Sequence, residues 1–69
     1  MYQPNRIIMC MNLMLEQIEP KMKAFIKDAT AQYERGNKAA GRRARRTSLE
    51  LETLLKQFRK RSMAFSKRL

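Results

Sequence analysis

The chain has 69 residues and a mass of 8.2 kDa, enough for one small domain with a modest core. Sixteen Lys and Arg against six Asp and Glu give a net charge of +10 at pH 7, with no His, no Trp and a single Cys. This composition excludes a zinc site, an internal disulfide and a Ser/His/Asp triad, and so short a chain leaves no room for a substrate pocket. We therefore expect a binding protein and not an enzyme, with no cofactor, no metal and no small-molecule substrate.

The first predicted element is an amphipathic helix over about residues 5–35. Its apolar residues recur at spacings of three and four and fall within an arc of about 120° at 100° per residue. Pro20 interrupts the segment opposite this stripe, so the pattern fits either a solvent-side kink or a helix that restarts at Pro20. The stripe consists of Ile7, Ile8, Met11, Met14, Leu15, Ile18, Met22, Phe25, Ile26, Ala29 and Tyr33.

The apolar run at residues 7–15 lies near the start of this helix. It is far shorter than the roughly 18 residues that a membrane span needs, and it lacks a small-residue cleavage site. We interpret it as a helix face and expect no transmembrane segment. The unpaired Cys10 is consistent with a reducing cytoplasm.

The signal that ends this first helix and the signal that begins a second one lie at adjacent residues. Gly36 supplies the left-handed conformation that ends a helix, and Asn37 is a strong N-cap for the next one. This pair predicts an αα-hairpin, with a second helix over about residues 38–66 and a frayed end at residues 67–69. The second apolar stripe consists of Ala40, Ala44, Thr47, Leu51, Leu54, Leu55, Phe58, Ser62 and Phe65.

The sequence thus predicts an all-α protein built as an antiparallel two-helix hairpin. A single hairpin covers only one side of each apolar stripe, so we expect a homodimer that forms a four-helix assembly. The alternative is a loose hairpin whose stripe is covered only on nucleic acid or in a larger assembly.

Positive charge is confined to the second half of the chain. Residues 1–34 carry four basic and four acidic side chains, whereas residues 35–69 carry twelve basic against two acidic ones. Such a face predicts contacts to the phosphates of a nucleic acid, with little sequence preference because the aromatic residues lie on the inner stripes. The candidate nucleic-acid-binding residues are Lys38, Arg42, Arg43, Arg45, Arg46, Lys56, Arg59, Lys60 and Arg61.

The run from Gly36 to Arg45, Gly-Asn-Lys-Ala-Ala-Gly-Arg-Arg-Ala-Arg, resembles the turn motif of the bacterial linker-histone-like proteins, small basic nucleoid proteins of chlamydiae and Bacteroidetes. The likeness spans Met22 to Ser62. It implies an α-helical, nucleoid-associated protein that binds DNA without sequence specificity and helps to condense the chromosome. The likeness continues, at matching spacing, through Ser48, Leu51, Glu52, Lys56, Phe58, Arg59, Lys60 and Ser62.

Three segments follow from this comparison. We expect residues 1–21 to be an N-terminal extension that continues the first helix, residues 22–66 to be the basic DNA-binding hairpin, and residues 67–69 to fray. Several Met residues in the first segment leave two alternatives open, a genuine extension or a start assigned too early.

Other partners fit the charge pattern as well. RNA offers the same phosphates as DNA, and an anionic membrane surface attracts basic amphipathic helices. A coiled-coil adaptor for an acidic protein is a further alternative.

Overall fold

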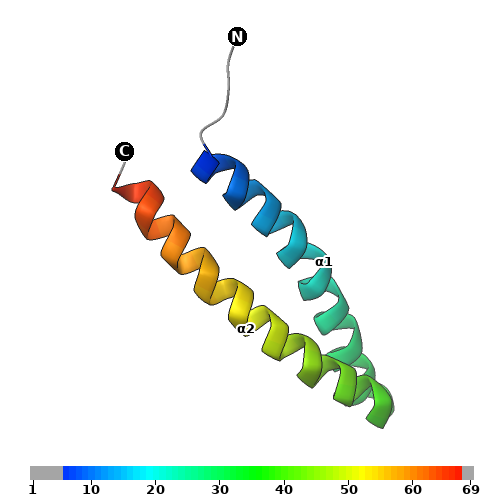
Figure 1. Ribbon diagram of the computed structural model, residues 1–69. Coiled ribbons are helices and arrows are strands. Elements are labelled where there is room, and N and C mark those ends of the chain that lie inside the picture. Colours follow the sequence, from blue (N-terminus) through cyan, green and yellow to red (C-terminus); the bar gives the residue numbers. More distant parts are fainter. Residues whose placement is uncertain (1–5, 68–69) are drawn as a thin grey trace.

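The computed structural model describes residues 6–67, with side chains from residue 12 onward, so the predicted stripe positions Ile7, Ile8 and Met11 lie outside the described side chains. It contains two helices, α1 at Arg6–Arg35 and α2 at Lys38–Ser66, packed as an antiparallel hairpin (Figure 1). The hairpin is a rod of 52 × 23 × 14 Å. The all-α hairpin is confirmed, and dimerisation stays a prediction.

The turn between the helices takes only two residues. Gly36 has a φ of 65°, and its N–H donates to the carbonyl of Gln32 at 2.9 Å, so α1 ends in the left-handed conformation expected of glycine. Asn37 is extended, and its side-chain Oδ1 accepts from the N–H of Ala40 at 3.0 Å. The predicted stop and the predicted cap are both present, and together they reverse the chain.

Pro20 lies inside α1, which runs through it without a break. Its side chain is exposed, as expected for a residue opposite the apolar stripe. The helix is therefore continuous, and it does not restart at Pro20.

The packing between α1 and α2 changes along the rod. Next to the turn, α2 buries small residues, Ala40, Gly41 and Ala44. Toward the open end, Met14, Ile18 and Leu51 form the buried cluster, with Phe25, Leu54 and Phe58 packed against it. Small side chains allow helix axes to approach and large ones hold them apart, which explains why the helices meet at the turn and separate toward the termini (Figure 1).

Among the described side chains, two ion pairs connect the helices along one flank of the hairpin. Lys21 of α1 pairs with Glu50 of α2. Asp28 of α1 accepts from Arg43 of α2, at 3.4 Å from Nε and 3.3 Å from Nη2. Because at least one partner of each pair is well exposed to solvent, each pair contributes at most about 1 kcal/mol, and their main effect is to fix the register of the hairpin.

The hairpin covers only part of the apolar stripe of α1. Met14, Ile18 and Phe25 pack against α2, whereas other members of the stripe face outward. Tyr33 is 91% exposed, so the prediction that it packs in the core is wrong. It lies two residues before the end of α1, where α2 presents only small side chains and offers no pocket for an aromatic ring.

Candidate nucleic-acid interface

The side of α2 that points away from α1 is rich in basic residues. The core positions Ala44 and Leu51 fix the inner side of this helix, and residues near half a turn from them lie on the outer side at 100° per residue. All of these basic side chains are exposed. We define the outer basic face as Lys38, Arg42, Arg45, Arg46, Lys56 and Lys60.

The outer basic face consists of two clusters. One runs from Lys38 to Arg46 and the other from Lys56 to Lys60, and residues 47–55 between them contain no Lys or Arg. This interval is about 15 Å long at 1.5 Å per residue. Of the two acidic side chains in it, Glu50 is paired with Lys21, which leaves Glu52 as the acid nearest the basic face.

Three of the nine predicted basic residues lie off this face. Arg59 is exposed, but at 100° per residue it lies on the same side of α2 as the buried Gly41. Arg43 projects toward α1 and donates to Asp28, whose side chain is only 16% exposed. Arg61 lies beside α1, where it lines a shallow depression with Leu13, Met14 and Gln17. The structure therefore brings six of the predicted residues onto one face and places three on the flanks of α2.

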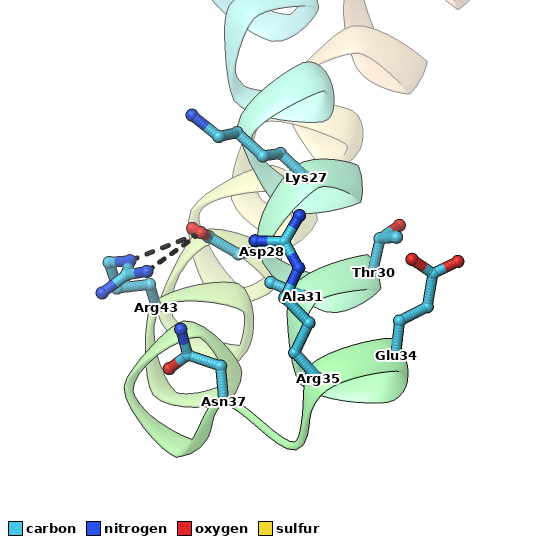
Figure 2. Close-up of a pocket in the computed structure, with 8 residues that line it drawn as sticks. All are labelled: Lys27, Asp28, Thr30, Ala31, Glu34, Arg35, Asn37 and Arg43. Atoms are coloured by element: carbon cyan, nitrogen blue, oxygen red, sulfur yellow. Dashed lines mark hydrogen bonds and ion pairs between the residues drawn. The ribbon is translucent and has the colours of Figure 1, made fainter.

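The start of α2 lies at the tip of the hairpin. Its first turn carries no acidic residue, and the N–H of Ala40 is occupied by the Asn37 cap. Figure 2 shows Lys27, Arg35 and Arg43 around a pocket of about 340 Å³ beside this start, with Asp28 bound to Arg43 in its wall. Glu34 also lines the pocket, so basic and acidic groups are mixed there, and the outer basic face is the more uniformly positive surface.

The pairing of Asp28 with Arg43 was missed from the sequence. The sequence pattern predicts Arg43 on the basic face and gives no role to Asp28, although a two-residue turn fixes which positions of the helices face each other. Counting outward from that turn places Asp28 opposite the first turns of α2. Opposite charges at facing positions were the signal that could have found the pair.

Neither described helix has a stretch that is both long and apolar enough to cross a bilayer. Among the residues whose side chains are described, 12–67, no group of three or more His, Cys, Asp or Glu could hold a metal ion.

Comparison with known proteins gives one finding. The family described as "Histone H1-like protein Hc1" matches residues 12–68, a longer stretch than the resemblance read from the sequence. The searches of curated proteins and of solved structures each give no match.

Proposed function

Because the chain belongs to the histone H1-like Hc1 family, we propose that it is a nucleoid protein that binds DNA without sequence specificity and helps to condense and organise the bacterial chromosome. The binding element is the outer basic face of α2. The basic residues directed toward α1, Arg43 and Arg61, contribute less.

The observation that supports this proposal is the separation of charge in the hairpin. α2 carries nine Lys and Arg against two Glu, a net charge of +7, while α1 carries five against four. Since α1 covers the inner side of α2, the positive charge is displayed on the outer side. A rod-like polyanion can meet that side over much of the length of the helix.

Specificity is expected to be low. The basic side chains are exposed, Phe25 and Phe58 pack against the buried cluster, and Phe65 is half-buried. The exposed Tyr33 belongs to α1 and not to the outer basic face. Contacts to phosphates position a protein on a duplex without reading its sequence. Five or six neutralised phosphates give a log–log dependence of affinity on salt with a slope of about −5.

A salt-titrated gel shift tests the proposal. The protein is titrated onto duplexes of unrelated sequence between 50 and 300 mM salt, and structured RNA is added as a competitor. We expect a slope of about −5 and similar affinity for every duplex. A slope near zero or a strong preference for one duplex would refute non-specific phosphate binding, and capture by RNA at the expense of DNA would reassign the nucleic acid.

A further inference from the structure

The two clusters of the outer basic face are separated by a segment of different chemistry. Residues 47–55 contain no Lys or Arg and extend over about 15 Å. At 100° per residue, Leu49 lies opposite the fully buried Ala40, at the centre of the outer side of α2, and its side chain is 66% exposed. Glu52 is exposed close to it on the same side. The middle of the outer side therefore presents an apolar side chain and an acid between two positive clusters.

This middle segment does not suit a row of phosphates. Phosphates follow each strand of a DNA duplex without a gap, one per 3.4 Å of its length. If α2 lay along one strand, Glu52 would be repelled by the phosphates and Leu49 would be pressed against ionised groups. Both conflicts disappear when the two clusters contact different strands, because the middle segment then faces the groove between them.

The dimensions of the grooves decide which groove this is. An α-helix with its side chains is about 10–12 Å across, and the major groove of B-form DNA is about 12 Å wide. The minor groove is only about 6 Å wide and does not admit a helix. The major groove winds around the duplex, whereas α2 is one uninterrupted helix of 29 residues. Only a central part of α2 can therefore stay in the groove, and both of its ends cross the phosphate backbones.

We propose that residues 47–55 of α2 enter the major groove of B-form DNA, while the cluster at 38–46 contacts one phosphate backbone and the cluster at 56–60 contacts the other. The proposal rests on the DNA-binding function proposed above and specifies its substrate as the B-form duplex. An RNA duplex offers the same phosphates, but its major groove is deep and narrow, so the same helix does not enter it. α1 covers the opposite side of α2 and stays outside the groove.

Leu49 is then the side chain that meets the edges of the bases. In the major groove, the C5-methyl group of thymine is the apolar group that a protein side chain can contact. Loss of one methyl group from an apolar contact corresponds to about fourfold in affinity. Since every A·T pair presents this methyl group, the contact favours thymine over uracil without selecting a particular sequence.

Three duplexes of one sequence test the groove, with fluorescence anisotropy measured across a salt titration. The first is plain DNA, the second is DNA with glucosylated 5-hydroxymethylcytosine, whose sugar fills the major groove and leaves the phosphates unchanged, and the third is RNA. Plain DNA should give a slope of about −5. On the other two duplexes, affinity should fall at least tenfold and the magnitude of the slope by about 1.8, because the two contacts from Lys56 and Lys60 are lost.

Leu49→Gln and a matched control, Met63→Gln, test the contact to the bases. Met63 is 64% exposed and lies within about 40° of Leu49 on the outer side of α2, but it lies outside the middle segment. The parent and Met63→Gln should bind DNA about fourfold more tightly than the same duplex with uracil in place of thymine. Leu49→Gln should bind the two duplexes equally. Circular dichroism should show unchanged helicity for both variants, because neither side chain is buried.

Equal affinity and equal slope for plain and glucosylated DNA, or for DNA and RNA, would overturn the placement of α2 in the major groove while leaving phosphate binding intact. A parent chain that binds thymine and uracil duplexes equally, or a Leu49→Gln variant that still distinguishes them, would overturn the role of Leu49. Failure to bind plain DNA would refute the proposed function, and the groove placement would fall with it.

Discussion

The direction of each Arg side chain should decide its contribution to DNA binding, and two double variants isolate that effect. Arg42→Gln/Arg45→Gln removes two charges from the outer basic face, and Arg43→Gln/Arg61→Gln removes two charges from the flank beside α1. Both variants lower the net charge from +10 to +8. If DNA affinity depended on net charge alone, both variants would lose the same affinity.

The expected magnitude follows from counterion release. Each phosphate contact contributes about 0.9 to the slope of log affinity against log salt. Losing two contacts on the outer face should lower the magnitude of the slope by about 1.8, equivalent to about 60-fold weaker binding at 0.1 M salt. The flank variant should change the affinity several-fold less, and the loss of the Arg43–Asp28 pair should cost about 0.5 kcal/mol of stability.

Fluorescence anisotropy with one labelled duplex between 50 and 300 mM salt gives both slopes, and circular dichroism confirms that both variants stay helical. If the two variants weaken binding equally, the position of a charge on α2 does not matter. In that case our assignment of the outer basic face as the contact surface is wrong.

Three substitutions test the fold by urea unfolding. Asn37→Ala removes the acceptor for the N–H of Ala40 and should lower the free energy of unfolding by about 1 kcal/mol; no change would show that the cap is not needed. Gly41→Ala gains about 1 kcal/mol of helix propensity, and the added Cβ meets only the movable end of Gln32, so a net gain of about 0.5 kcal/mol is expected. A clear loss would mean that Gln32 cannot move away. Leu51→Ala should cost about 2–3 kcal/mol, because Leu51 belongs to the buried cluster; a cost below about 1 kcal/mol would contradict that packing.

The hairpin could be predicted from the sequence because its determinants are local. The left-handed Gly36 and the capping Asn37 act within a few residues, and the bounds predicted for α2 match Lys38–Ser66. Apolar periodicity likewise identified Met14, Ile18 and Leu51 as core residues. These features depend on neighbours along one helix and not on how two helices meet.

Features that depend on how the two helices pack against each other could not be predicted from the periodicity of either helix. Periodicity groups Ile26 and Tyr33 with the core residues, because it reports a face about 120° wide, whereas α2 covers only part of that face. The placement of Arg43 on the flank depends on the register of the hairpin, which the Asp28 contact shows. The contribution of each basic residue to binding stays a prediction.

The change from small to large side chains along the rod bears on how the chain folds. Gln32 and Gly41 meet across the turn with few residues between them, whereas contacts between the Met14 end of α1 and the Phe58 end of α2 enclose most of the chain. Closing the shorter loop costs less entropy, so pairing starts at the turn. The residues that gain most from burial lie in the half that closes later. We therefore expect folding to begin at the turn, where closing the loop costs the least entropy. Most of the stabilising burial is gained only later, when the halves of α1 and α2 far from the turn pack together.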